Sequence, residues 1–264
     1  HLPNYSWHGS PICARLMRFF VNHNSPDQEQ RAQELAEELN LDFFYNHENQ
    51  RAKSFSEDYF LICSEDRLYL RKGLRRNARP IFSDFDDWAK NYDDRLLKKS
   101  LKGLPINFSC LDATAGFGKD AIEISKLKNC KNLVLLEKES WVFKLLEDGI
   151  KNARSNQALD LLNKFTILNI DNLDFLQSKK INFDLIYIDP MFSGVYKAKA
   201  KKHMQAIRDL SHIEDSLGLL ESCLSFAKFK VVVKRHKNME YLEGLKPTRS
   251  LEGKVVRYDI YNTN

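Results

Sequence analysis

Short apolar segments alternate with helical segments from residue 109 onward, and this alternation restricts the fold more than any other feature of the 264-residue chain. Such alternation is typical of a parallel sheet with helices on both faces, whose buried strands read as nearly continuous apolar runs. The last segment, 255–261, is predicted to form an antiparallel edge strand. The predicted parallel strands lie at 110–111, 133–136, 165–168, 185–188 and 231–233, and the predicted helices at 120–128, 141–153, 173–177 and 214–226.

The first 85 residues have a different pattern. Ser25-Pro26-Asp27-Gln28 predicts the start of a helix, with Ser25 as its cap and Pro26 at the first helical position. The apolar segments 59–63 and 67–70 flank Ser64-Glu65-Asp66, which predicts a hairpin. We therefore expect a small N-terminal α/β domain over residues 1–85, followed by a larger α/β domain over residues 86–264.

Composition sets limits on the protein's partners. Lys and Arg number 41 against 36 acidic residues, a net charge of +5 that permits a polyanionic partner without requiring one. The five cysteines form no Cys-x-x-Cys pair, so we expect free thiols in the cytoplasm and no metal site. No apolar run reaches the roughly 18 residues that span a membrane, and we expect no signal peptide. The sequence gives no indication of the oligomeric state.

The segment Leu111-Asp-Ala-Thr-Ala-Gly-Phe-Gly-Lys-Asp120 is the central motif. It predicts a strand, a glycine turn and the start of a helix, and ligands of open α/β sheets bind beyond such strand ends. Ala115, Gly116 and Gly118 lie in the turn, where glycine lets the backbone approach a ligand closely.

Two cofactors fit this turn. Gly116-x-Gly118-x-x-Ala121, followed by Glu137, matches the dinucleotide fingerprint. A pyrophosphate is anionic, however, and Asp112 and Asp120 would flank it with two carboxylates. S-adenosylmethionine carries an ammonium and a sulfonium, so the acids favour that cofactor.

Further polar residues follow the later strands. Glu137 is placed to accept both ribose hydroxyls, and Asp171-Asn172 is placed to hold the adenine amino group. One acid at a strand end is usually a turn or a helix cap, but the ordered set is a much stronger signal. The expected fold is a class I, Rossmann-like methyltransferase sheet of seven strands behind the small N-terminal domain.

The strand at 185–188 continues into Asp189-Pro190-Met191-Phe192. Many enzymes that methylate exocyclic amines carry Asn/Asp-Pro-Pro-Tyr/Phe here. Such an amine shares its lone pair with the ring, and the Asp189 carboxylate and Pro190 carbonyl are expected to accept its N–H groups and direct that lone pair toward the methyl group. Phe192 is expected to stack on the base. The plain alternative is a turn that only ends a strand.

Basic residues gather in four clusters, two of which follow strands whose ends lie at the predicted site. Any one such run is usually a solvated face, but convergence on one rim suits a phosphate backbone. One of the four clusters comprises Lys98, Lys99 and Lys102. The predicted RNA-binding residues are Arg71, Arg75, Arg76, Lys197, Lys199, Lys201, Lys202, Lys234 and Arg235.

The chain resembles the bacterial family of small-subunit ribosomal RNA guanine methyltransferases called RsmJ, from about residue 30 to the end. The resemblance implies methylation of the exocyclic amino nitrogen of one guanosine near the 3′ end of 16S rRNA. The segments that carry it are 68–72, 81–85, 112–120, 136–138, 187–192, 232–235 and 257–261. The cofactor contacts that it implies are Lys119, Asp120, Glu137, Lys138, Asp171, Asn172 and Asp189.

The chain departs from that family in three places. Lys119 stands where family members usually carry Arg, and Asp171-Asn172 where they carry small hydroxyl residues. The stretch 91–97 reads Asn-Tyr-Asp-Asp-Arg-Leu-Leu in place of a Gly- and Arg-rich segment.

Two other functions remain open at this level. One is an exocyclic-amine methyltransferase that acts on DNA adenine or protein glutamine, and the other is a nucleic-acid-binding protein with a vestigial cofactor site. The sequence also leaves open whether naked rRNA or an assembled small subunit is the partner.

Overall fold

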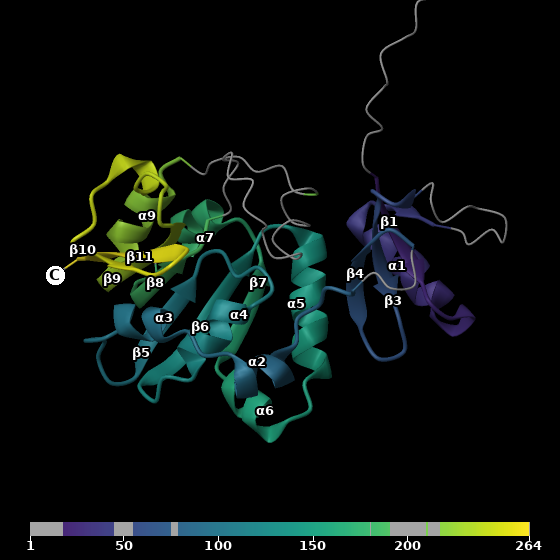
Figure 1. Cartoon of the computed structure of the whole chain (residues 1–264), viewed down its shortest axis with the longest axis horizontal. Coiled ribbons are helices and arrows are strands. Elements are labelled where there is room, and N and C mark those ends of the chain that lie inside the picture. The colour runs from purple at the N-terminus through teal and green to yellow at the C-terminus, as the bar shows by residue number, and fades with distance from the viewer. Residues whose placement is uncertain are drawn as a thin grey trace, which may run out of the picture.

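The structure, a computed structural model, describes residues 18–44, 55–74, 79–179, 181–190, 210 and 217–263. It contains one sheet of four strands and one of seven (Figure 1). The four-stranded sheet is built from residues before position 73 and the seven-stranded sheet from residues after position 107. The two sheets therefore fall on either side of the boundary that we predict at residues 85/86.

The smaller sheet has the strand order β2-β1-β3-β4 and one long helix, α1, packed against it. β3 and β4 pair antiparallel, with Tyr59 opposite Lys72 and Cys63 opposite Leu68, which confirms the predicted hairpin. Ser25 lies at the predicted cap position of the short 3₁₀ turn Pro26–Gln28 that precedes α1, and Pro26 begins that turn as predicted, but the Ser25 side chain makes no capping hydrogen bond. The elements are β1 (Phe19–His23), α1 (Glu29–Leu39), β2 (Asp42–Phe43), β3 (Tyr59–Cys63) and β4 (Leu68–Lys72).

The larger sheet has the order β10-β11-β9-β8-β5-β6-β7, and its five strands from β9 to β7 are parallel. This confirms the expected sheet of seven mostly parallel strands. The chain runs outward from β5 to β7 on one side and then from β8 to β11 on the other, so β5 and β8 meet at a topological switch point. The strands are β5 (Phe108–Asp112), β6 (Cys130–Glu137), β7 (Phe165–Asn169), β8 (Phe183–Ile188), β9 (Ala227–His236), β10 (Arg249–Glu252) and β11 (Val256–Asn262).

The predicted antiparallel strand at 255–261 is present, but it is not the edge of the sheet. β11 is antiparallel to β9, as expected, but β10 pairs along its other side and forms the edge of the sheet. β10 has only four residues, Arg-Ser-Leu-Glu, and just one of them is apolar. A strand this short and polar carries too little alternation to be recognised in a sequence.

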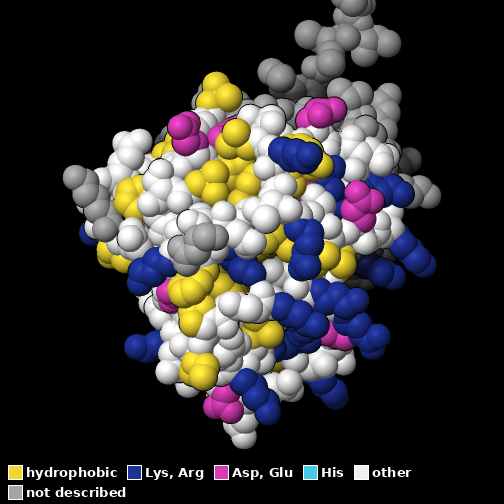
Figure 2. Space-filling view, turned by 90° about the vertical axis from the view of Figure 1, so that its left-hand side faces the viewer, with side chains coloured by type: hydrophobic (Ala, Val, Ile, Leu, Met, Phe, Trp, Pro, Cys, Tyr) yellow, Lys and Arg dark blue, Asp and Glu magenta, His cyan; other side chains and the backbone are white. Residues whose placement is uncertain are grey.

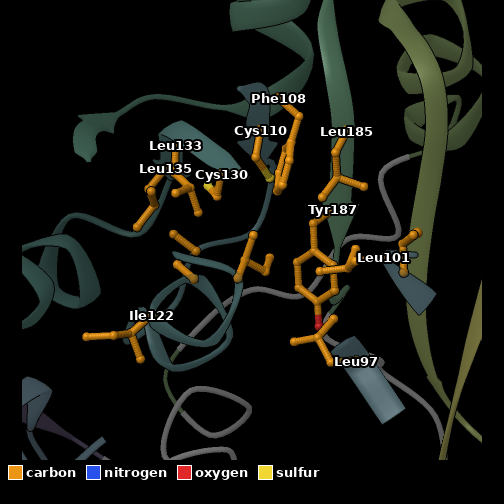
Figure 3. Packing of buried hydrophobic residues seen from close by; sticks show 14 of the residues in the cluster. Leu97, Leu101, Phe108, Cys110, Ile122, Cys130, Leu133, Leu135, Leu185 and Tyr187 are labelled. Atoms are coloured by element: carbon orange, nitrogen blue, oxygen red, sulfur yellow. The ribbon is translucent and has the colours of Figure 1, made fainter. Parts of the chain in front are cut away.

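Helices cover both faces of the larger sheet. α2, α3, α4 and α6 pack on the face that carries Cys110 and Leu185, whereas α7 and α9 pack on the face that carries Leu111 and Ile186. Figure 3 shows the Tyr187 ring extending from β8 toward α3 among these side chains. The helices are α2 (Phe85–Asn91), α3 (Arg95–Ser100), α4 (Lys119–Ser125), α5 (Ser140–Asn152), α6 (Asn156–Leu162), α7 (Asn172–Lys179) and α9 (Leu219–Phe226).

α5 joins the two parts of the molecule, as Figure 1 shows. Trp141 and Leu145 of this helix share a buried apolar cluster with Leu61 of the smaller sheet. Asp148 of α5 is 8% exposed, accepts the Leu68 backbone N–H at 2.8 Å and pairs with Arg31 at 3.1 Å. A buried carboxylate with both kinds of partner fixes the smaller sheet against the larger one.

Candidate functional site

Three carboxylates meet at the carboxyl ends of adjacent strands. Asp112 ends β5, Glu137 ends β6, and Asp189 directly follows β8. Burial is the main reason that the pKa of Asp112 is raised, and the charges of Asp120, Asp189 and Glu137 raise it further, so these carboxylates lie within electrostatic reach of Asp112. The convergence that we predicted for these acids is confirmed.

The two glycines of the loop between β5 and α4 have different roles. Gly116 has a φ of +54°, and a Cβ added there would have no atom within 4 Å, so it faces open space at the rim. Gly118 has a φ of +82°, and a Cβ there would lie 2.8 Å from side-chain atoms of both Phe85 and Leu146. Gly118 is therefore required for packing α4 against the helices around it, whereas Gly116 leaves room for a ligand.

Asp112 and Glu137 are held by backbone N–H groups. Asp112 is 1% exposed and accepts the Thr114 N–H at 3.1 Å. Glu137 accepts the Gly116 N–H at 2.9 Å and the Glu139 N–H at 2.8 Å, one on each oxygen. These bonds orient the Glu137 carboxylate, and two of its roughly four acceptor positions stay open for ribose hydroxyls.

The environment of both acids suits a cationic ligand. Burial, with the neighbouring carboxylates, raises the pKa of Asp112 to about 8. Burial raises the pKa of Glu137 to about 7. Buried carboxyls with raised pKa values and no cation bonded to them in the described residues gain stability from a positive charge placed nearby.

The start of α7 gives a second indication that this site binds a ligand. Asp171 accepts the Leu173 N–H at 2.8 Å, which caps the helix, and the Asn172 amide donates to the Ala113 carbonyl at 3.2 Å. Asn172 is 8% exposed, and its Oδ1 is buried without a hydrogen-bond donor among the described residues. Leaving a buried acceptor unpaired costs about 1–3 kcal/mol, and an amino group of a bound ligand would satisfy it. The residues present therefore fit S-adenosylmethionine.

A buried ion-pair network joins this site to the proposed catalytic turn. The Lys234 ammonium on β9 lies 2.5 Å from Asp120 Oδ2 and 2.9 Å from Asp189 Oδ2. Burial lowers the pKa of Lys234, but the two carboxylates outweigh burial and raise it well above its ordinary value. Lys234 is therefore a fixed cation that holds both carboxylates.

The two carboxylates differ in their other partners. Asp120 also accepts the Tyr187 hydroxyl at 2.7 Å and the Tyr92 hydroxyl at 3.0 Å. Burial alone would raise the pKa of Asp120, but Lys234 and the two phenols lower it. Burial raises the pKa of Asp189, against the opposing effect of Lys234, and a quarter of its side chain is exposed. Asp189 thus keeps a surface toward solvent, whereas Asp120 anchors Lys234.

Three residues that bind Asp120 or Asp189 were not predicted from the sequence. Thr114 Oγ1 accepts the Asp189 backbone N–H at 2.7 Å and so ties the glycine loop to the catalytic turn. Tyr187, the one aromatic residue after Phe183 in β8, carried a signal, because its hydroxyl needs a buried partner. Tyr92 lies between two helices and carried none.

The structure also describes the surroundings of five further predicted residues. Lys119 places its ammonium 4.3 Å from the centre of the Tyr92 ring, a cation–π contact, and Lys138 is exposed. Arg235 is 6% exposed and donates twice to the Glu240 carbonyl, at 2.7 and 3.0 Å. Lys234 and Arg235 are thus not on an exposed basic rim, which corrects that expectation, and Arg71 is half-buried on β4.

Several predicted residues lie outside the described part of the chain. They are Arg75, Arg76, Met191, Phe192, Lys197, Lys199, Lys201 and Lys202. Pro190, the second residue of the catalytic turn, is described and half-buried.

The described residues contain no group of three or more His, Cys, Asp or Glu side chains arranged to hold a metal ion. None of their helices is long and apolar enough to cross a membrane. Cys63, Cys110, Cys130 and Cys223 are buried free thiols, and burial raises the pKa of each.

The fold and the site define a class I methyltransferase. The structure aligns with a SAM-dependent methyltransferase from Neisseria gonorrhoeae with a TM-score of 0.66 at 21% identity, over 92% of this chain and 96% of that one. Residues 35–263 match the family described as "Putative SAM-dependent methyltransferase".

Curated relatives carry a more specific name, Ribosomal RNA small subunit methyltransferase J. The protein of that name from Francisella philomiragia subsp. philomiragia is 40% identical over 157 residues, which span 58% of this chain and 65% of that relative, just under two thirds of its length. The one from Francisella tularensis subsp. holarctica is 31% identical over 219 residues, 76% of this chain and 89% of that protein. The chain belongs to this family of SAM-dependent methyltransferases.

The raised pKa values predict how stability depends on pH. Unfolded carboxyls lose their protons near pH 4, whereas folded Asp112 keeps its proton up to about pH 8. The folded state then binds more protons between these limits, so the free energy of unfolding falls as the pH rises through this range, by about 1.4 kcal/mol per unit of pKa shift at most. Denaturant unfolding at pH 5 and pH 8 measures this fall. Asp112→Asn should reduce it, and an unchanged fall in that variant would contradict the assignment.

Proposed function

We propose that this chain transfers a methyl group from S-adenosylmethionine to the exocyclic amino group of a guanosine in small-subunit ribosomal RNA. The observation that carries the proposal is the position of Asp189, a partly exposed carboxylate beside the acids that suit the cofactor. The name that these relatives carry supports small-subunit rRNA as the substrate. Since rRNA is modified where ribosomes are assembled, we place the reaction in the cytoplasm.

Each described residue of the site has a role in this proposal. Glu137 accepts the ribose hydroxyls, Asn172 Oδ1 accepts an adenine N–H, and Asp112 balances the positive charge of the methionine end. Bound S-adenosylmethionine supplies a methyl group that is already activated, so no covalent nucleophile is needed, and the buried thiols have no part in the reaction.

The chain's contribution to the transfer is to prepare the amine. A guanine amino group is a poor nucleophile because its lone pair is shared with the ring. The Asp189 carboxylate and the Pro190 carbonyl accept the two N–H groups and turn the lone pair toward the methyl group. Lys234 binds Asp189 Oδ2 at 2.9 Å, which leaves Oδ1 for the amine.

The test is transfer of labelled methyl groups to four acceptors: unmethylated small subunits, 16S rRNA transcribed in vitro, DNA and protein. We expect label in one or both rRNA samples. Label in the transcribed 16S rRNA shows that naked RNA is a substrate, whereas label only in the small subunits shows that an assembled subunit is required. If label appears only in DNA or only in protein, the proposed rRNA substrate is wrong. Titration calorimetry with S-adenosylmethionine accompanies the assay, and no binding at high micromolar concentration would contradict an enzymatic function.

A further inference from the structure

α3 lies across β11 and β10, from the rim that carries the carboxylates toward the opposite edge of the sheet. At the rim end, the Tyr258 hydroxyl of β11 donates to Asp94 Oδ2 at 2.8 Å, just before α3 begins. At the far end, Lys230 of β9 donates to the Lys102 carbonyl at 2.7 Å, just after α3 ends. Figure 3 shows Leu97 of α3 and Leu101, the residue that follows the helix, directed toward Tyr187 of β8, so the helix is fixed on the sheet.

Five exposed cations line the outer side of this helix and of the strands beside it. Arg95 and Lys99 are four residues apart on one face of α3, and Lys102 lies in the turn that follows the helix. Arg249 of β10 stands opposite Ile260, whose side chain belongs to the core beneath α3, so both point to the α3 side. Lys254 lies in the turn between β10 and β11. We call these five residues the basic α3 surface.

Few acids balance this surface. Asp93 is exposed and pairs with Arg95 at 3.2 Å and with Lys98 at 2.8 Å. Glu252 of β10 points to the other face of the sheet, because it is an odd number of residues from Arg249. Within the described part of the chain, Lys99, Lys102, Arg249 and Lys254 have no carboxylate within ion-pair distance. Figure 2, which views the edge formed by the C-terminal strands, shows Lys and Arg side chains crowded along one side with few acids among them.

Two of the cations that the sequence placed at the rim, Lys234 and Arg235, do not provide such a surface. Lys234 is held by two carboxylates and Arg235 is buried on a backbone carbonyl. A nucleic acid that presents one base at Asp189 needs phosphate contacts on an exposed surface that reaches the same rim.

We propose that the basic α3 surface binds the phosphate backbone of the substrate RNA beside the modified nucleotide. The inference rests on the proposed function, and it names the surface by which that substrate docks. The α3 helix places its cations in a row that starts at the rim and leads away from it. A row of exposed cations with few acids among them, on and beside a helix that is fixed to the sheet, suits a chain of phosphates, and the salt dependence of binding then reports how many contacts form.

The test compares two double charge reversals of equal net charge. Lys99→Glu with Lys102→Glu changes the surface, whereas Lys151→Glu with Lys179→Glu changes exposed lysines on α5 and α7. The probe is 16S rRNA transcribed in vitro, bound at several salt concentrations. We expect the first variant to bind at least tenfold more weakly, to lower the slope of log K against log salt by about 1 per residue changed, and to raise KM more than it lowers kcat.

The control variant should bind and methylate as the parent does, and both variants should bind S-adenosylmethionine as the parent does. An equal loss in both variants would show a general effect of net charge and overturn the inference. Unchanged binding in the first variant would also overturn it. If the parent methylates no RNA at all, the proposed function fails, and that result is distinct from a parent that is active and insensitive to these changes.

Discussion

Asp189→Ala should lower methyl transfer to rRNA by about a factor of 10³, while the variant still binds S-adenosylmethionine. Removal of a single oriented hydrogen-bonding group that acts in the transition state typically costs 10²–10³ in kcat, and Asp189 in addition orders the ammonium beside it. Of the described residues only Lys234 is bonded to this carboxylate, so the loss falls on the chemical step rather than on the fold. Single-turnover rates with saturating cofactor measure it.

Asp189→Asn is the matched control for that variant. The amide carbonyl still accepts an amine N–H, and Asn occupies this position in many enzymes that methylate exocyclic amines. We expect Asp189→Asn to keep substantially more activity than Asp189→Ala. Near-normal turnover in the alanine variant would remove Asp189 from the reaction.

Lys234→Met should lower turnover near neutral pH by about a factor of 10², and activity should recover as the pH rises. The Lys234 charge lowers the pKa of Asp189 against the effect of burial. Without that charge the pKa of Asp189 rises, so at neutral pH more of the enzyme carries a protonated acid, whose carbonyl oxygen accepts the amine N–H more weakly than the carboxylate does. The acid limb of the pH–kcat profile should therefore move to higher pH.

The shift of the pH–kcat profile distinguishes an effect of Lys234 on Asp189 from a general loss of folding. Lys234→Arg keeps the charge and should leave the acid limb near its original place, even if the larger guanidinium lowers the rate. Equal losses in both variants with no movement of the acid limb would show that Lys234 only supports the packing of β9.

The sheet could be predicted from the sequence because its strands are buried. Strands such as 133–136 and 185–188 are apolar throughout, and such runs alternating with amphipathic helices leave few folds open. The convergence of Asp112, Glu137 and Asp189 followed from the same argument, since parallel strands end at one rim. β10 was missed because an edge strand of four residues needs no apolar pattern.

The partners of the charged residues could not be predicted in this way. Lys234 and Arg235 are adjacent in a basic run, yet one side chain points to two carboxylates and the other to the Glu240 carbonyl. Alternation along a strand sends neighbours to opposite faces, but it does not tell which groups meet them there. The contact between Tyr92 and Asp120 depends on how α2 and α3 pack, which no local pattern encodes.

The most direct test of the account is nucleoside analysis of 16S rRNA after reaction with the protein and S-adenosylmethionine. Mass spectrometry of the digested RNA should show N2-methylguanosine, in an amount that depends on Asp189 and approaches one per molecule. Methylation of a different base, or RNA that gains no methyl group while DNA or protein does, would contradict the proposed reaction.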